Sequence, residues 1–169
     1  AMYFNPYWAI HALSDNCAVR QDPACAYEAL GLSSIKFNDL KWQYIEPDAP
    51  INGNHTYDWS VLDDAVLRWE DAGARRLIFH LAPASPWGVE DSRTIAEDVF
   101  GLDCDEIGGN CEDYPANPKP EHWADWESWV TEMCERYDGD GVGDIDGLQH
   151  AHLEFQLINE AQNFFFYFG

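Results

Sequence analysis

The sequence is poor in basic residues and has no long apolar run. Only 9 lysines and arginines stand against 31 aspartates and glutamates, which gives a formal net charge of −22. So acidic a surface repels phosphate backbones and argues against nucleic acid as a partner, whereas neutral sugars or cations such as calcium fit it better. No apolar run is long enough to span a bilayer, and no basic segment followed by an apolar one opens the chain, so we expect no membrane association.

Cysteine is scarce and is not spaced for zinc. Four of the five cysteines form two short pairs, Cys17 with Cys25 and Cys104 with Cys111, and neither pair has a second cluster at zinc-ligand spacing. We predict two loop-closing disulfides and therefore an oxidising, extracellular or periplasmic compartment. Free cysteines in a cytosolic chain are the alternative. Cys134 lies on a helical apolar face and is expected to be a buried thiol.

The apolar content is sufficient for one folded domain. The 169 residues are 46% hydrophobic and 15% aromatic, which argues against disorder. We expect a single domain over residues 1–169, with no internal repeat and no linker. The chain begins at Ala1 and ends at Gly169 directly after an aromatic run, so we expect it to be cut from a longer protein.

Short apolar runs alternate with helical patterns along the chain. Such alternation predicts an α/β fold in which helices cover a parallel sheet. The predicted strands are residues 2–10, 34–37, 76–80 and 152–160, and the predicted helices are residues 24–30, 58–72 and 121–137.

Two of the predicted helices have a clear apolar stripe. In residues 58–72 the apolar side chains recur every three or four positions, Asp58 can cap the start, and Gly73 stops the helix. Residues 121–137 repeat the pattern. We expect both stripes to be core: Trp59, Leu62, Val66 and Trp69 in the first helix, and Trp123, Trp126, Val130, Met133 and Tyr137 in the second.

The last predicted strand has a period of two. Leu153, Phe155 and Leu157 point one way, and the alternate residues up to Glu160 point the other. In a closed (β/α)8 barrel of the TIM type, the first set would face the helices and the second the interior, with Glu160 at the mouth. We expect about four β/α units, half of such a barrel. A doubly wound open sheet fits the alternation nearly as well, although no glycine-rich phosphate loop follows the first strand.

Polar and aromatic side chains gather where the predicted strands end. In barrels of this type the working groups lie on the loops after the carboxyl ends of the strands. The segment 81–120 is far longer than packing requires and has no helical pattern, and loops of that length are usually functional or disordered. The residues at these positions are Asn38, Asp39, Lys41 and Trp42 after the second strand, His80, Pro86 and Trp87 after the third, and Asn159, Glu160 and Gln162 after the fourth.

Two stretches carry a family resemblance. KWQYIEPDAPINGNHTYDWSVLDDAVLRWEDAGARRLIFHLAPASPWG, residues 41–88, has a Trp and Ile-Glu-Pro after strand two, Tyr-Asp-Trp-Ser and Leu-Asp opening the next helix, and Ala-Gly before strand three. FQLINEAQNFFFYFG, residues 155–169, ends the fourth strand on Asn-Glu. In this order the motifs resemble the retaining glycoside hydrolases of the large (β/α)8-barrel clan, over residues 28–168.

The resemblance implies hydrolysis of O-glycosidic bonds in an oligo- or polysaccharide by double displacement. Glu160 would be the general acid/base, which protonates the glycosidic oxygen and later deprotonates water. Asn159 would hydrogen-bond the sugar 2-hydroxyl, and no cofactor would be required. Because indole faces stack on pyranose rings, the implied substrate-binding set is Asn159, His80, Trp42, Trp87 and Asn38.

The match departs from the family pattern in several places. Lys36 stands where the clan usually has an Arg, and Ala161 stands where it often has Pro after Asn-Glu. The nucleophilic Glu of the clan belongs to strand seven, which these residues do not contain, so we expect the 169 residues alone not to turn over substrate. Glu46, in the Ile-Glu-Pro motif, is expected to be structural.

An acidic, glycine-rich segment follows the last predicted helix. Asp138, Asp140, Asp144 and Asp146 are interspersed with glycines, and carboxylates so arranged can wrap a structural calcium ion; a solvated turn is the competing interpretation. Residues 54–56 form an Asn-His-Thr glycosylation sequon. Two alternatives to the hydrolase stay open: a barrel that binds carbohydrate without catalysis, and an extracellular domain that binds calcium through the acidic segment.

Overall fold

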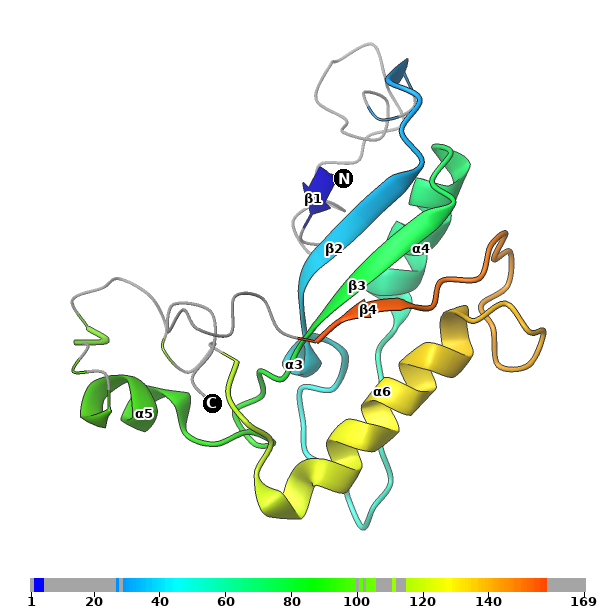
Figure 1. Ribbon diagram of the computed structural model, residues 1–169. Helices are drawn as coiled ribbons and strands as arrows, with labels where there is room; N and C mark the ends of the chain where they lie inside the picture. Colours follow the sequence, from blue (N-terminus) through cyan, green and yellow to red (C-terminus); the bar gives the residue numbers. More distant parts are fainter. Residues whose placement is uncertain are drawn as a thin grey trace. The chain divides into compact units, whose positions relative to one another are not determined.

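The fold is a mixed α/β arrangement with a small parallel sheet (Figure 1). The computed structural model describes residues 2–4, 27, 29–99, 101, 103–105, 111 and 115–157. Within this part of the chain, none of the helices combines the length and the apolar character that crossing a membrane requires.

The four strands of the sheet lie side by side in the order of the sequence, β1-β2-β3-β4, with β1 and β4 at its edges (Figure 1). The register pairs Met2 with Ile35 between the first two strands and Phe79 with Phe155 between the last two. Each predicted strand therefore has a counterpart, although residues 5–10 and 158–160 of the predictions lie outside the described residues. The strands are β1 (Met2–Phe4), β2 (Ser34–Lys41), β3 (Arg76–Ala82) and β4 (Glu154–Gln156).

The two helices with predicted apolar stripes are confirmed as α4 and α6. The segment 81–120 also contains a helix, α5, so the expectation of no helix there was wrong. Its 7 residues are too few for periodicity to show, and its signal is the cap, because the Asp91 carboxylate accepts from the backbone N–H of Thr94 at 3.1 Å. The helices are α3 (Trp42–Ile45), α4 (Ser60–Asp71), α5 (Ser92–Asp98), the 3₁₀ turn η3 (Pro120–His122) and α6 (Trp123–Tyr137).

The start of α4 differs from the prediction. Trp59, not Asp58, occupies the N-cap, and no side chain caps the helix there. Trp59 is buried, and its ring centroid lies 6.0 Å from the Arg136 guanidinium, so a packed indole stands where a polar cap was predicted. The predicted stop is confirmed, because Gly73 adopts φ +96°, a conformation that glycine reaches without a side-chain clash.

The buried stripe of α6 begins later in the helix than predicted. Trp123, expected in the core, is 52% exposed, and Trp126 is half-buried. Met133 and Tyr137 are fully buried as predicted, and Trp129, outside the predicted stripe, is fully buried too. The helix begins at Trp123, so this side chain projects from the first turn, before the buried stripe starts.

Contacts within the chain group the residues into two compact units, described separately below. Unit 1 comprises Ala1–Leu40, Trp59–His80 and Thr131–Gln156, and therefore contains the sheet and α4. Unit 2 comprises Lys41–Asp58, Leu81–Val130 and Leu157–Gly169, and contains α3 and α5. The expectation of a single domain over residues 1–169 stays a prediction.

Aromatic rings form the core of unit 1. Phe79 stacks on Phe37 of β2 and on Phe155 of β4, with 5.6 and 5.9 Å between ring centroids, and these three residues define the phenylalanine face of the sheet. Tyr137 of α6 stacks on Phe79 at 5.3 Å, and its hydroxyl donates to Asp63 of α4 at 2.9 Å. The phenylalanine face therefore packs against α6, to which α4 is tied.

The alternation predicted for the last strand is present only in part. Phe155 belongs to the phenylalanine face, which α6 reaches. Leu153 and Leu157, expected on the same helix-facing side, are 60% and 62% exposed. In the described residues β4 is an edge strand of three residues, and these two leucines flank it at either end.

Candidate functional site

Polar side chains share one face of the sheet in unit 1. Because successive strand residues point to opposite faces, Lys36, Asn38, His80 and Gln156 lie on the side opposite the phenylalanine face. His80 and Gln156 are paired in register between β3 and β4. Lys36 and His80 are buried, and Asn38 is half-buried. Two predicted sugar contacts, Asn38 and His80, thus belong to one polar face toward the carboxyl ends of their strands.

The two residues predicted to carry the chemistry follow β4 in the sequence. Asn159 and Glu160 lie outside the described residues, as do the predicted disulfide partners Cys17 and Cys25. β4 ends at Gln156, so the sequence leads from the polar face directly into the Asn-Glu pair. Their catalytic roles stay predictions.

Four tryptophans pack together in unit 2 and form the tryptophan cluster: Trp42, Trp87, Trp126 and Trp129. The Trp42 ring centroid lies 4.5 Å from that of Trp87 and 5.4 Å from that of Trp126, in both cases edge-on. Trp126 stacks on Trp129 at 4.8 Å. Trp42 is fully buried and Trp87 is half-buried. Of the two indoles predicted to contact sugar, Trp87 therefore has exposed surface here, and direct stacking by Trp42 stays a prediction.

Glu46 is fully buried and is hydrogen-bonded to two indoles of the tryptophan cluster. Its Oε2 accepts a hydrogen bond from Trp42 Nε1 at 2.9 Å, and its backbone carbonyl accepts one from Trp87 Nε1 at 3.3 Å. The remaining carboxylate oxygen, Oε1, lies 2.8 Å from His55 Nδ1. The expected structural role of Glu46 agrees with this geometry, since a buried carboxylate is tolerated only where its oxygens are hydrogen-bonded.

A series of contacts between imidazoles and carboxylates continues from Glu46. His55 Nε2 lies 3.5 Å from Asp125 Oδ1, and His122 Nδ1 lies 2.7 Å from the other oxygen of Asp125. The His122 ring meets Trp87 edge-on at 5.2 Å between centroids. This series of contacts therefore begins at a fully buried carboxylate and ends at a partly exposed imidazole beside the half-buried Trp87.

Sequence reasoning missed His55, His122 and Asp125. His55 was noticed only as the middle residue of a glycosylation sequon, and the other two belong to the start of a helix. His55 is far from Asp125 in the sequence, so no local spacing signals their contact. Two local signals were available: the Trp with Ile-Glu-Pro pattern places Trp42 and Glu46 one helical turn apart, and His122 and Asp125 are three residues apart.

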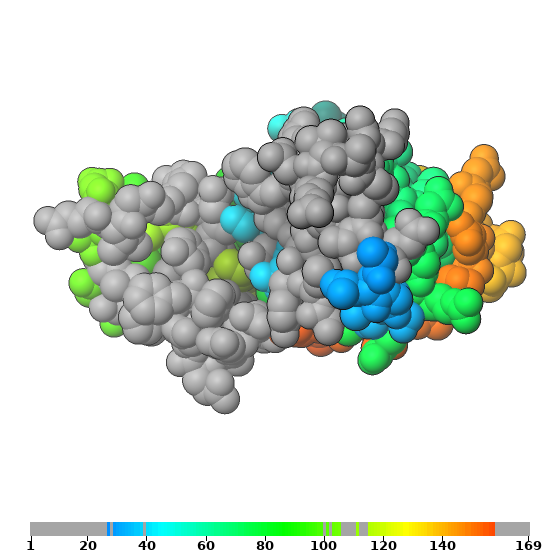
Figure 2. Space-filling view, turned by 90° about the horizontal axis from the view of Figure 1, so that it is seen from above, coloured from blue at the N-terminus to red at the C-terminus, as the bar shows by residue number. Residues whose placement is uncertain are grey.

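The acidic segment after α6 lies at the surface, where Figure 2 shows it in orange. Asp138, Asp140 and Asp144 each bring one oxygen to within 4.8 Å of the others, whereas Asp146 is not in this group. Asp144 accepts backbone hydrogen bonds from Gly139 at 2.8 Å and from Gly141 at 2.6 Å. These bonds by themselves explain the turn, and calcium binding stays a prediction.

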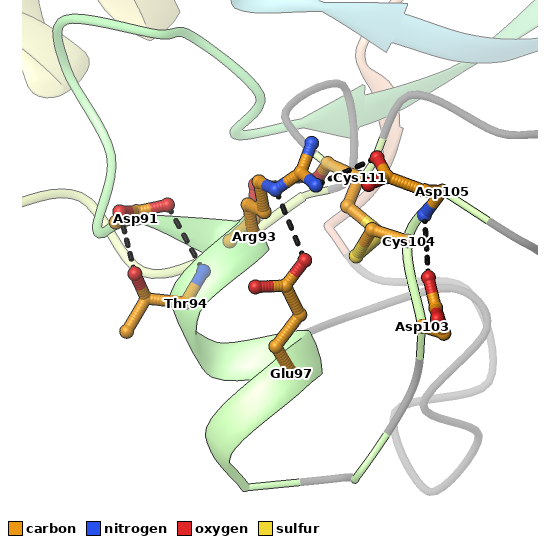
Figure 3. The surroundings of a disulfide bond; sticks show 9 residues. Asp91, Arg93, Thr94, Glu97, Asp103, Cys104, Asp105 and Cys111 are labelled. Atoms are coloured by element: carbon orange, nitrogen blue, oxygen red, sulfur yellow. Dashed lines mark hydrogen bonds and ion pairs between the residues drawn. A yellow bond between two sulfur atoms is a disulfide. The ribbon is translucent and has the colours of Figure 1, made fainter.

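The predicted disulfide between Cys104 and Cys111 is confirmed, and both cysteines are buried. Figure 3 shows Arg93 of α5 reaching Glu97 and Asp105, beside the disulfide, at 3.0 and 2.8 Å. The Ser92 hydroxyl donates to the Cys111 carbonyl at 2.7 Å. The disulfide is therefore joined to α5. Cys134 is a free thiol that is half-buried, not buried as predicted, and burial raises its pKa.

Comparison with known proteins adds no relative: no family model matches the sequence, and no curated protein or solved structure matches it either.

Proposed function

We propose that the chain belongs to a retaining glycoside hydrolase with a (β/α)8-barrel fold, in which Glu160 is the general acid/base and Asn159 binds the sugar 2-hydroxyl. The nucleophilic glutamate would come from a later strand of the same barrel, since the resemblance assigns no residue of this chain to it. The substrate would be a neutral or weakly charged oligo- or polysaccharide, and the reaction would need no cofactor.

The observation that carries the proposal is the order of the strands. A doubly wound sheet reverses its order at a switch point, where its ligands bind. A barrel instead adds each new parallel strand beside the preceding one. The order β1-β2-β3-β4 follows the second pattern over the described strands and so favours the barrel over the open sheet.

The polar face of the sheet supports the same function. In barrel enzymes the catalytic groups project from the carboxyl ends of several strands. Asn38 and His80 lie toward that end of β2 and β3, and Gln156 ends β4 four residues before Glu160. In the period-two pattern of the predicted strand 152–160, Gln156 and Glu160 belong to the same alternating set.

The charge and the disulfide bear on substrate and location. A net charge of −22 repels polyanionic glycans, so neutral sugars are the substrates we expect. The Cys104–Cys111 disulfide suits an oxidising compartment, and we propose secretion to the extracellular space or the periplasm.

The test is Glu160→Gln in the protein expressed from its complete reading frame. Loss of a general acid/base costs about 10²- to 10⁴-fold in kcat/KM, and the loss should be largest for glycosides with poor leaving groups, which need protonation. Aryl glycosides with strongly acidic phenols need no protonation to leave, so their first step should be spared. Azide should then restore turnover, because it attacks the glycosyl-enzyme without a general base.

The matched control is Glu132→Gln, an exposed glutamate of α6, which should leave kcat/KM unchanged for every leaving group. Equal activity of the wild type and Glu160→Gln on poor leaving groups would refute the acid/base role. Absence of hydrolysis by the wild type, combined with oligosaccharide binding, would instead favour the carbohydrate-binding alternative.

A further inference from the structure

Two indole N–H groups converge on one residue in unit 2. Glu46 accepts the Nε1–H of Trp42 with its carboxylate and that of Trp87 with its backbone carbonyl. A fully buried carboxylate is costly unless its oxygens are hydrogen-bonded, and here Trp42 and His55 bond the two oxygens. The same contacts that stabilise the buried charge therefore fix the direction of the Trp42 ring.

Trp42 has no room to move within this arrangement. A Cβ atom added to Gly88 would lie 2.4 Å from Cζ3 of the Trp42 ring, which is closer than real Cβ atoms approach. Trp126 closes a second side of the ring, edge-on at 5.4 Å. Only glycine at position 88 lets the indole reach Glu46, so the backbone and the hydrogen bond act together on one ring orientation.

Trp87 rests on Trp42 and is held at three further points. Its Nε1 donates to the Glu46 carbonyl, its own backbone carbonyl accepts from Lys119 Nζ at 2.9 Å, and its ring packs edge-to-face with His122 at 5.2 Å between centroids. The ring is nevertheless half-buried, not fully buried. Trp87 thus has part of its ring exposed to solvent while contacts with its neighbours hold the side chain in place.

We propose that Glu46 and His55 are positioning residues of an aromatic platform, in which Trp87 faces the ligand and the buried Trp42 supports it. The inference rests on the proposed function, since the ligand would be a neutral sugar ring stacked on the indole. Glu46 and His55 touch no sugar. They act by fixing the indoles before binding, and a ring ordered in advance does not lose side-chain freedom when the ligand arrives.

The experiment compares Glu46→Leu with the wild-type protein by two independent measurements. The first is the exciton couplet in the far-ultraviolet circular dichroism spectrum, which reports the mutual orientation of the paired indoles without any ligand. The second is fluorescence titration with gluco-, xylo-, manno- and galacto-oligosaccharides. Glu121→Leu, at an exposed position in η3, is the matched control.

We expect Glu46→Leu, which keeps the volume but accepts no hydrogen bond, to weaken the couplet and to bind oligosaccharide about threefold to tenfold more weakly, the cost of ordering one side chain on binding. His55→Ala, which leaves the Trp42 bond intact, should give a smaller loss of both. Glu121→Leu should match the wild type. If Glu46→Leu lacks a cooperative melting transition, His55→Ala decides the question by itself.

A preserved couplet and an unchanged affinity in Glu46→Leu, or in His55→Ala where that variant decides, would overturn the positioning role while leaving the proposed function standing. Failure of the wild type to bind or hydrolyse any of these sugars would refute the proposed function. In that case the couplet alone settles whether Glu46 orients the indoles, so the two failures are distinguishable.

Discussion

Glu70 and His152 form a buried pair in unit 1 that fixes the approach to β4. His152 Nε2 lies 2.9 Å from Glu70 Oε1, and both side chains are fully buried. The two carboxylate oxygens also accept backbone N–H groups of His150 at 2.8 Å and Gln149 at 2.9 Å. One carboxylate at the end of α4 therefore holds the segment that leads into the last described strand.

This pair makes stability depend on pH near neutrality. Burial lowers the pKa of His152 below its ordinary value of 6.5, although the contact with Glu70 opposes the shift. The unfolded chain therefore binds the proton more readily than the folded protein does. The contribution of His152 to stability is complete above about pH 6.5 and is lost progressively as the pH falls below that value.

Urea unfolding between about pH 8 and pH 5 measures this dependence, and the free energy of unfolding should decline over the acidic part of the range. His152→Gln retains an N–H donor for Glu70 but does not titrate. The slope of its free energy of unfolding against pH should therefore be smaller than that of the wild type, by the equivalent of up to one bound proton. An equal slope in both proteins would assign the pH dependence to other groups.

At the scale of elements, α5 shows how a short helix is held without a long apolar stripe. Its N-cap, Asp91, accepts from the backbone and the hydroxyl of Thr94, and these bonds lower the pKa of the Asp91 carboxyl. Ser92 and Arg93 tie the helix to the disulfide and to Asp105. Capping and cross-linking thus replace the burial that stabilises α4 and α6.

Asp91→Ala should lower the stability of α5 by about 1 kcal/mol, the usual cost of losing an N-cap acceptor. Faster amide hydrogen exchange in Ser92–Asp98, with unchanged exchange in α4, is the expected measurement. Asp98→Ala is the control, because an acidic residue at the carboxyl end of a helix opposes the helix dipole and its removal should not destabilise α5. Equal exchange in Asp91→Ala and the wild type would contradict the capping role.

Regular elements were largely predictable at this scale. The stripe of α4, the stop at Gly73 and the strands β2 and β3 follow from spacings of a few residues, which local sequence encodes. Trp123 and Asp58 were misassigned because periodicity gives the direction of a face but not where a helix begins. That limit is set by packing, as the burial of Trp59 in place of an Asp58 cap illustrates.

For the whole molecule, charge is the dominant global property. A net charge of −22 on 169 residues makes the compact state repel itself. Individual ion pairs such as Arg93 with Asp105 are exposed and offset little of this repulsion. The protein should therefore be more stable where ions screen its surface.

Raising sodium chloride to about 1 M, where the Debye length is about 3 Å, should raise Tm. Potassium chloride should give the same curve, because screening depends on ionic strength and not on the identity of the cation. Differential scanning calorimetry at fixed pH measures the effect. A Tm that is unchanged or falls with salt would show that local ion pairs outweigh the global repulsion.

The sequence by itself determined the α/β alternation and the disulfide across a short loop, because each depends on residues close together in the chain. Only the tertiary structure decided the order of the strands and the contacts of Trp42 with Trp87 and of His55 with Asp125. Those two contacts join residues far apart in sequence, and they form only when apolar burial brings the segments together, which no local spacing records.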